Sequence, residues 1–573
     1  QIALVLVALI VIMSTVQAWR AVRALDEAES LAQGLSDRIA QGDVAGARAR
    51  LDAFDRATTT ARKSTDGPIW WLGSKFPYVG RNIGALRTIA AASDSVSDRV
   101  LPGVVDVADQ VQLETFRPRN KRVDLEAVAR ALPVLAEADQ TLAEADARVM
   151  AIDVPRLMPL LQLRAGEAQA KFHQTAVAVA AAHDTARLLP TMLAERGPTR
   201  RYLMLVMNNA EVRSLAGMPG SMAVITARRG KVDMGQQGGI LDVDPLVDEA
   251  LDVKRELAAG FASTIASDIR DTTSVPDFPR AAQAAAAIVE ERWDEDFDGV
   301  VAIDPVALSY VLAGLGSVDV GDGIQLNQNN AVRTLLNVVY VRYPLDPVRQ
   351  DDVFELAARR SFDALVDGRG NSVRTIRGLL RGVQERRIML WSRSEREQSL
   401  ISSNGLAGAL THDRRTPEVA AFLNDAGSSK MQYYLRTSSR LQTRKCYANG
   451  VQALRLTTTL RSDAPQGVAL PLSITGPGRY VGQGDMRLHL LVMGPQGGRV
   501  TALRVDGKRA PVGRNAYRGR AIARVSRVLP PGQSTVITAD VQTAPGATSA
   551  AVLRTTPGVQ ANDDVVETRS CAS

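Results

Sequence analysis

The sequence of 573 residues has few of the side chains that build metal and cofactor sites. It contains two cysteines and four histidines, and it has no Walker loop, zinc-binding spacing or nucleophile elbow. Aromatic residues make up only 4% of the chain, whereas 45% of the residues are hydrophobic and 23% are charged. This composition is typical of globular proteins and excludes a disordered chain, a collagen and a polytopic membrane protein. We expect several folded domains and no certain cofactor.

The chain also lacks a strong excess of one charge. Its 69 Lys and Arg residues against 62 Asp and Glu residues give a net charge of +7, which does not indicate a nucleic-acid partner. Residues 430–573, however, hold 20 basic and 7 acidic residues. Two interpretations of this basic part remain open. It contacts an anionic neighbour, such as lipid headgroups or wall phosphates, or it is a solvated arginine-rich surface.

The two cysteines, Cys446 and Cys571, both lie in the basic part of the chain. A disulfide between them would fasten the end of the chain to the start of the domain and would contribute on the order of 4 kcal/mol to stability. Two reduced thiols are the alternative, which an oxidising compartment disfavours. We expect the disulfide.

Long hydrophobic runs are rare, and the longest begins the chain. Residues 1–19 carry no charge before Arg20, and ~19 residues at about 1.5 Å each nearly cross a hydrocarbon core of ~30 Å. Because Val16-Gln17-Ala18 resembles a cleavage site, a signal peptide is the alternative. We expect a retained transmembrane anchor at 1–19. This predicts a single-pass protein of the cell membrane with the bulk of the chain outside the cytoplasm.

Four of the few aromatic residues are gathered in residues 67–80, namely Trp70, Trp71, Phe76 and Tyr78. Tryptophan and tyrosine favour the headgroup level of a bilayer, where the ring is buried and the polar atom stays wet. We therefore expect these four side chains to form a membrane-proximal interface loop. A buried corner between helices is the alternative.

Three patterns divide the rest of the chain. Apolar residues in 20–195 recur at a spacing near 3.6, which predicts a helical bundle that contains the aromatic loop. In 196–423, short apolar runs such as 202–207 alternate with helical segments, which predicts an α/β domain. Residues 424–573 contain short β-rich runs between glycine and proline turns, which predicts a basic antiparallel β-sandwich. The predicted fold class is a multidomain α+β protein with an N-terminal transmembrane helix.

Several segments resemble an uncharacterised bacterial family, the domain of unknown function 4012. They are Arg201–Arg213, Gly217–Ser221, Pro276–Pro279, Asp298–Leu308 and Asn424–Gly427. With the aromatic loop, the resemblance covers nearly the whole chain, but the family implies no activity.

A more distant resemblance is to the LytR–CpsA–Psr proteins, through residues 298–320, Tyr340–Tyr343 and Arg349–Gln350. That family is membrane-anchored and transfers glycopolymers from a polyprenyl pyrophosphate carrier to peptidoglycan, using arginines and carboxylates that bind Mg²⁺. The resemblance implies that Arg213, Arg342 and Arg349 bind an anion or pyrophosphate. Two carboxylates and at least two arginines of the family's site are missing here, because Pro344 replaces one arginine and Glu211 is the only acid in the first loop.

We therefore expect a cell-envelope protein that works without catalysis. Its expected partners are the cytoplasmic membrane and either a lipid-linked glycopolymer, peptidoglycan or another membrane protein. The alternative is a phosphotransferase that attaches polyprenyl-pyrophosphate-linked glycopolymer to peptidoglycan, with Mg²⁺ held by Glu211, Asp242 and Asp244. A pocket lined by Arg213, Arg342 and at least two carboxylates, with apolar depth for a prenyl chain, would favour the enzyme.

Overall fold

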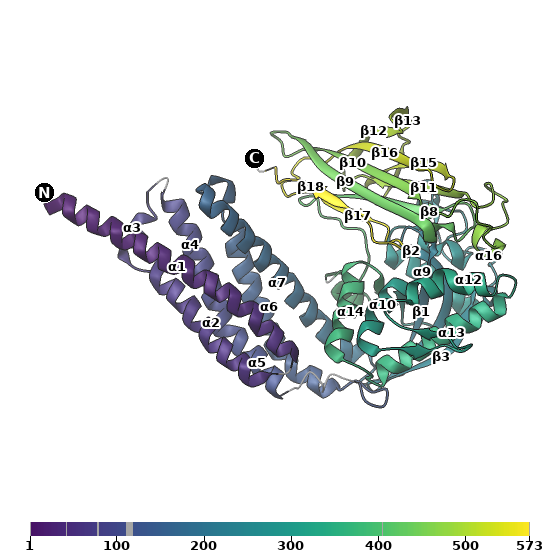
Figure 1. Cartoon of the computed structure of the whole chain (residues 1–573), viewed down its shortest axis with the longest axis horizontal. Helices are drawn as coiled ribbons and strands as arrows, with labels where there is room; N and C mark the ends of the chain where they lie inside the picture. The colour runs from purple at the N-terminus through teal and green to yellow at the C-terminus, as the bar shows by residue number, and fades with distance from the viewer. Residues whose placement is uncertain (1, 42, 77–78, 111–117, 404, 572–573) are drawn as a thin grey trace. The chain divides into compact units, whose positions relative to one another are not determined.

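The computed structural model describes the whole chain except residues 1, 42, 77–78, 111–117, 404 and 572–573. The chain forms two compact units, Gln1–Arg196 and Gly197–Ser573. It is a mixed α+β multidomain protein in which the first unit is helical and the second contains the sheets (Figure 1).

Long helices build the first unit. They are α1 (Ile2–Gln41), α2 (Val44–Thr65), α3 (Pro68–Gly73), α4 (Val79–Arg99), α5 (Leu101–Gln110), α6 (Leu125–Met150), the 3₁₀ turn η2 (Val154–Arg156) and α7 (Pro159–Met192). The side chain of Asp43 caps α2, because it accepts a hydrogen bond from the amide of Gly46. Alanines at the helix contacts, such as Ala24, Ala61 and Ala90, are small enough for the helices to approach closely.

The prediction of a transmembrane anchor at residues 1–19 is wrong. Within the described residues, no helix combines the length and the apolar composition that a bilayer crossing requires. The hydrophobic run instead continues, through Arg20 and Arg23, into the rest of α1, where Ala21 and Ala24 pack against other helices of the unit. The same finding contradicts the predicted single-pass location in the cell membrane.

The aromatic segment at 67–80 contains the short helix α3, and one of its tryptophans packs against other helices of the bundle. Trp70 is 5% exposed, packs against Ala21 and Leu86, and donates a hydrogen bond from Nε1 to Gln17 Oε1 at 2.7 Å. Its neighbours Trp71 and Phe76 are 57% and 60% exposed. Tyr78 lies outside the described residues. Trp70 is therefore a packing residue of the bundle, while two other aromatic side chains face outward.

A five-stranded sheet of order β3-β2-β1-β4-β7 begins the second unit. Its strands are β1 (Arg200–Arg213), β2 (Ala216–Arg228), β3 (Lys231–Gly239), β4 (Gly299–Ile303) and β7 (Ile388–Ser392). Only β1 and β4 run parallel. Helix α9 (Phe278–Trp293) covers one face, where Phe278 packs against Leu203 and Leu205. Since side chains alternate along a strand, Met204 and Val206 point to the other face.

Most remaining helices of this unit lie on or near that other face. The long ones are α10 (Pro305–Leu315), α13 (Pro347–Val366) and α14 (Ser372–Gln384). A continuous helical segment precedes α13 and consists of α11 (Ala331–Arg333), the π-helical turn η5 (Thr334–Val338) and α12 (Val339–Arg342). The short elements are η3 (Ile240–Asp242), α8 (Lys254–Ala258), η4 (Ile269–Ser274), β5 (Val318–Asp319), β6 (Gln325–Leu326), α15 (Glu395–Ser403), η6 (Met431–Tyr434) and α16 (Leu472–Thr475).

Two further sheets pack face to face as a β-sandwich, drawn green to yellow in Figure 1. One has the order β13-β12-β16-β10-β9-β18 and the other β14-β15-β11-β8-β17. The strands are β8 (Glu418–Asp425), β9 (Leu435–Cys446), β10 (Gln452–Ser462), β11 (Met486–Met493), β12 (Arg499–Val505), β13 (Lys508–Ala510), β14 (Asn515–Tyr517), β15 (Arg520–Leu529), β16 (Ser534–Gln542), β17 (Val552–Thr555) and β18 (Val565–Glu567). The pairs β17–β8 and β18–β9 are parallel, so the sandwich is not purely antiparallel.

The predicted disulfide is confirmed. Cys446, at the end of β9, is bonded to Cys571, with a distance of 5.6 Å between the two Cα atoms. This bond fastens the chain after β18 to the sheet edge that β18 extends.

Candidate functional site

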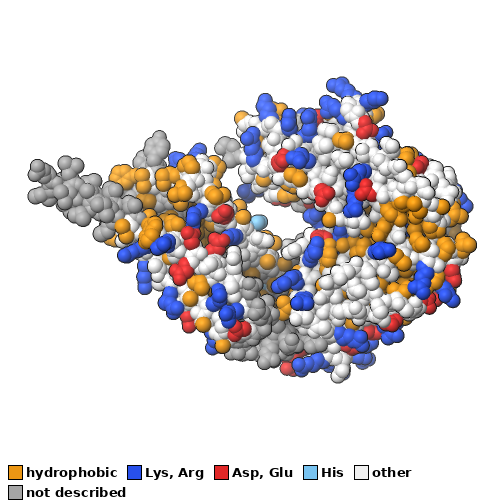
Figure 2. All heavy atoms as spheres, viewed as in Figure 1, with side chains coloured by type: hydrophobic (Ala, Val, Ile, Leu, Met, Phe, Trp, Pro, Cys, Tyr) orange, Lys and Arg blue, Asp and Glu red, His pale blue; other side chains and the backbone are white. Residues whose placement is uncertain are grey.

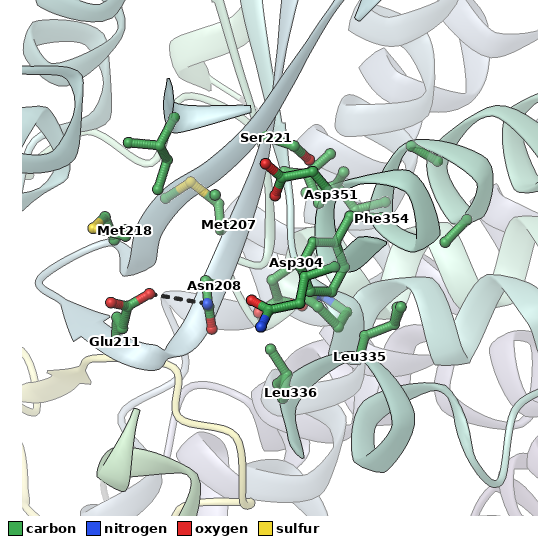
Figure 3. Close-up of a pocket in the computed structure, with 18 of the residues that line it drawn as sticks. Met207, Asn208, Glu211, Met218, Ser221, Asp304, Leu335, Leu336, Asp351 and Phe354 are labelled. Carbon is green, nitrogen blue, oxygen red and sulfur yellow. Dashed lines mark hydrogen bonds between the residues drawn. The ribbon is translucent and has the colours of Figure 1, made fainter. Parts of the chain in front are cut away.

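A cavity of about 680 Å³ lies between the five-stranded sheet and helices α10 and α13 (Figure 3). This volume is in the usual range of small-molecule binding sites. The lining residues that are exposed, among them Leu241, Arg270, Pro347, Ser428 and Tyr480, mark its mouth.

The cavity extends along α13, which lines it from Pro347 to Leu365. Eighteen residue steps of helix correspond to about 27 Å at 1.5 Å per residue. Small residues on the lining face of α13, Ala357, Ala358 and Ser361, leave this space open.

The interior of the cavity is apolar. Side chains from β1, β4, α10, η5, α13 and α14 supply this lining, and they are Met204, Val206, Ile303, Leu308, Val311, Leu335, Leu336, Phe354, Phe362, Leu365 and Leu379. The hydroxyl of Ser361 is buried among them without a hydrogen-bond partner. The π-helical turn places the consecutive residues Leu335 and Leu336 on the lining. Such turns often occur at binding sites.

The rim of the cavity is charged. Along β1 the lining changes from Met204 and Val206 to Asn208, Glu211 and Arg213. Three basic side chains line the rim, and each contacts one carboxylate: Arg213 Nη2 lies 3.5 Å from Asp271, Lys430 Nζ lies 3.3 Å from Glu211, and Arg270 Nη2 lies 2.6 Å from Asp268. Each of these three cations is thus paired with a carboxylate, for which a phosphate group could compete.

Buried polar contacts hold Glu211 and Lys430 in place. Asn208 Nδ2 donates to Glu211 at 3.0 Å and to the hydroxyl of Tyr340 at 3.0 Å. The ammonium group of Lys430 lies 4.7 Å from the centre of the Tyr340 ring, a cation–π contact. Figure 3 shows Asn208 and Glu211 from β1 and Asp351 and Phe354 from α13 around the same space.

Two further carboxylates of the rim lack a basic partner in direct contact. Burial raises the pKa of Asp425 to about 6, although the charge of Arg213 and the hydrogen bond from the amide of Gly427 oppose the shift. Burial and the charge of Glu355 likewise raise the pKa of Asp351 to about 6. Within the described residues, Asp351 forms no hydrogen bond or ion pair.

Of the three arginines predicted to bind an anion, the structure places only Arg213 at the cavity. Tyr340 points into the cavity, and at 100° per residue a helix turns Arg342 by 200° from it. Arg342 instead donates to the carbonyl of Asp322 at 3.0 Å. Arg349 is exposed and lies 3.6 Å from Asp346. Arg342 and Arg349 are therefore outside the lining but close to the mouth.

The three predicted metal ligands are not brought together. Glu211 is at the rim, as described above, whereas Asp242 accepts a hydrogen bond from the amide of Gly239 and Asp244 is exposed. Neither Asp242 nor Asp244 lines the cavity. In the described part of the chain, no group of three His, Cys, Asp or Glu side chains is arranged to hold a metal ion.

The sequence reasoning missed Asp351, Asp425, Arg270 and Lys430. Asp425 stands inside the segment Asn424–Gly427 that carries the family resemblance, where it was not assigned a role. Asp351 follows Arg349-Gln350 directly. The sequence signal for Asp351 was its position two residues after Arg349, which the resemblance assigned to the anion site.

Stability should fall as the pH rises through the range in which Asp351 titrates. Its pKa is about 6 in the folded chain against 3.8 in the unfolded chain, so the folded chain binds more protons between these values. The free energy of unfolding then decreases from pH 4 to pH 6. Asp351→Asn should raise it at pH 7.5 by up to about 3 kcal/mol and leave it unchanged at pH 4.

Urea denaturation at both pH values measures this effect. Asp352→Asn is the matched control, because it removes an exposed charge from the same turn of α13 and should change stability by less than about 0.5 kcal/mol. Equal effects of the two substitutions at pH 7.5 would contradict the prediction.

The fold and the cavity define an α+β protein in which a sheet, its covering helices and a β-sandwich enclose an apolar cavity with a charged rim. Residues 197–340 match the model of a family described as "Protein of unknown function (DUF4012)". The predicted resemblance to this family is thus confirmed for that segment. No curated protein matches the chain.

One similar solved structure is titled as the transcriptional regulator yvhJ from Bacillus subtilis. It is 13% identical, the match covers 36% of this chain and 78% of that chain, and the TM-score is 0.22. A TM-score this low supports no statement about fold or function. The resemblance to the LytR–CpsA–Psr proteins finds no support in these comparisons.

Proposed function

We propose that the cavity binds an amphiphile, with its hydrocarbon chain inside and a phosphate group at the rim. The observation that carries this proposal is the change from apolar to charged lining along both β1 and α13. A hydrocarbon chain would contribute about 0.8 kcal/mol per buried CH₂ group. A free anion would not need the apolar interior, and a purely apolar ligand would not need the basic rim.

The ligand class we favour is a polyprenyl phosphate or pyrophosphate that carries a glycopolymer. Its source is the sequence resemblance to the LytR–CpsA–Psr proteins, and the apolar lining along α13 supports a long hydrocarbon chain. Arg213 and Lys430 are the best candidates for the phosphate, because their carboxylate contacts of 3.5 and 3.3 Å are longer than the 2.6 Å contact of Arg270. We propose binding of this lipid-linked polymer without catalysis.

Glycopolymer transfer is the second candidate, favoured by one observation. Asp351 is a carboxylate without a hydrogen-bond partner, and its pKa of about 6 suits a group that accepts a proton near neutral pH. The enzyme would require a pocket lined by Arg213, Arg342 and at least two carboxylates. Arg213 and several carboxylates line the cavity, whereas Arg342 does not, so only part of this requirement is met. A Mg²⁺ ion would need the phosphates of the substrate among its ligands.

Blocking the cavity should weaken binding of farnesyl phosphate, a short soluble probe. Ala358→Trp places an indole in the apolar lining and should weaken binding at least tenfold. Arg360→Trp, on the exposed side of α13, is the matched control and should bind as the unchanged protein does. Arg213→Ala should weaken binding of farnesyl phosphate by about ten- to a hundredfold, since a charge-assisted hydrogen bond contributes about 1.5–3 kcal/mol. Calorimetric titration measures each affinity.

Three comparisons separate the parts of the proposal. Equal binding to Ala358→Trp and to the unchanged protein would place the ligand elsewhere. Farnesol bound as tightly as farnesyl phosphate would remove the role of the basic rim. Formation of polyprenyl monophosphate and of an acceptor-linked oligosaccharide phosphate, from a polyprenyl-pyrophosphate oligosaccharide with Mg²⁺ and peptidoglycan as acceptor, would establish transfer in place of binding alone if Asp351→Asn abolished both.

A further inference from the structure

Exposed apolar side chains surround one side of the cavity mouth. We call these residues the apolar collar, and their exposed fractions are 48% for Val341, 86% for Leu345, 66% for Val348, 56% for Leu472 and 58% for Tyr480. Figure 2 shows hydrophobic side chains gathered on this face, over the region that Figure 1 labels α12 and α16. Single exposed apolar residues are ordinary, but a group of them at the entrance of an apolar cavity is not.

The collar is continuous with the cavity. Tyr480 is itself a lining residue, Val341 follows the lining residue Tyr340, and Leu345 and Val348 flank the lining residue Pro347. Leu472 belongs to α16, and the hydroxyl of the next residue, Ser473, donates to the carbonyl of Tyr340 at 2.8 Å. The collar thus consists of three separate chain segments that meet at the mouth.

Arginines alternate with the apolar residues of the collar. Arg342 follows Val341, Arg349 follows Val348 and Arg479 precedes Tyr480, and all three arginines are exposed. The acids beside them are Asp322 and Asp346, at 3.9 and 3.6 Å from Arg349. Asp352, one helical turn after Val348, is exposed as well. Within the described residues, however, Arg342 and Arg479 form no ion pair, so two cations of the collar are available to an anionic neighbour.

We propose that the apolar collar rests on the surface of an anionic lipid bilayer, so that the cavity takes its ligand directly from the lipid phase. This inference rests on the proposed function, because only an amphiphile would have to pass from a bilayer into the cavity. Apolar side chains on short protruding segments enter the interface, tyrosine favours the headgroup level, and arginines bind anionic headgroups. Arg342 and Arg349, which the sequence resemblance assigned to the phosphate site, would thus contact the phosphates of the bilayer instead.

A fluorophore on the collar tests this contact locally. The full chain with Leu345→Cys, whose other two cysteines are paired, is labelled with the environment-sensitive dye NBD. The matched control is Leu380→Cys, which is 56% exposed on α14, next to the deep end of the cavity. Vesicles with 30% phosphatidylglycerol should shift the emission of the collar label to shorter wavelength and increase it severalfold. Vesicles of pure phosphatidylcholine should give a smaller increase, and the label at position 380 should not respond.

The outcomes distinguish the docking proposal from the proposed function. No response of the collar label to either vesicle overturns docking on lipid and assigns the collar to a protein partner. Equal responses at positions 345 and 380 also overturn it, because the contact would not be specific to the collar. Binding of farnesyl phosphate in solution without vesicles tests the cavity separately. A protein whose collar label responds to vesicles but that does not bind farnesyl phosphate would refute the proposed ligand of the cavity and support the proposed docking surface.

Discussion

An Arg387→Met variant should lose about 3–5 kcal/mol of unfolding free energy, because Asp304 would keep a buried carboxylate without a cation. Arg387 Nη1 lies 2.8 Å from Asp304 Oδ2, and the two side chains are 5% and 0% exposed. Arg387 also donates to the carbonyl of Gly558 at 3.0 Å, so the variant loses a contact to the segment after β17. Denaturation in guanidinium, followed by circular dichroism, measures the loss.

The chain contains a matched control for this prediction. Arg381 contacts Glu385 at the same distance of 2.8 Å, but its side chain is 59% exposed. Arg381→Met should therefore cost less than about 1 kcal/mol. Combining Arg387→Met with Asp304→Asn should recover part of the stability, since the buried charge is then absent. Similar losses in the two single variants would mean that burial does not determine the strength of the pair.

Removal of the disulfide should have a similarly large effect. Cys446 and Cys571 are separated by 125 residues, and closing a loop of this length restricts the unfolded chain by about 4–5 kcal/mol. The double variant Cys446→Ser/Cys571→Ser should unfold at a correspondingly lower guanidinium concentration. Amide hydrogen exchange should increase first in β18, because this short strand is the edge of its sheet, pairs only with β9 and is followed by Cys571.

Reductant provides the control. It should destabilise the unchanged protein to the level of the double variant and have no effect on the variant itself. If reductant changes neither protein, the bond does not contribute to stability.

Much of the fold follows from local sequence patterns. The apolar run at 202–207 lies within β1, the segment 424–573 is largely a β-sandwich, and both cysteines are paired. The strand and the sandwich are recognised from residues that are close together in the chain. The disulfide follows because the chain has only two cysteines. The transmembrane prediction failed because it used the hydropathy of residues 1–19 alone. These residues belong to the longer helix α1, which continues through charged residues to Gln41.

The rim of the cavity could not be read from the sequence in the same way. Its groups come from β1, the segment around η4, α13 and the start of the sandwich, and Arg213 and Asp425 are 212 residues apart. No local spacing connects such positions. The motif resemblance placed Arg342 with Arg213, but the phase of a single helical turn at α12 directs Tyr340, not Arg342, into the cavity.

The β-sandwich supplies Asp425, Lys430 and Tyr480 to a cavity whose walls belong to the five-stranded sheet and its helices. The segment that matches the family ends at residue 340, before any of these three positions. A protein that shares only that segment would therefore keep Glu211, Arg213 and Arg270 of the rim and the lining from β1, β4 and α10, but it would lack the lining from α13 and α14 and the three sandwich residues. An exchange of the sandwich for another module would therefore replace part of the charged rim and leave the apolar lining from the sheet and its helices in place.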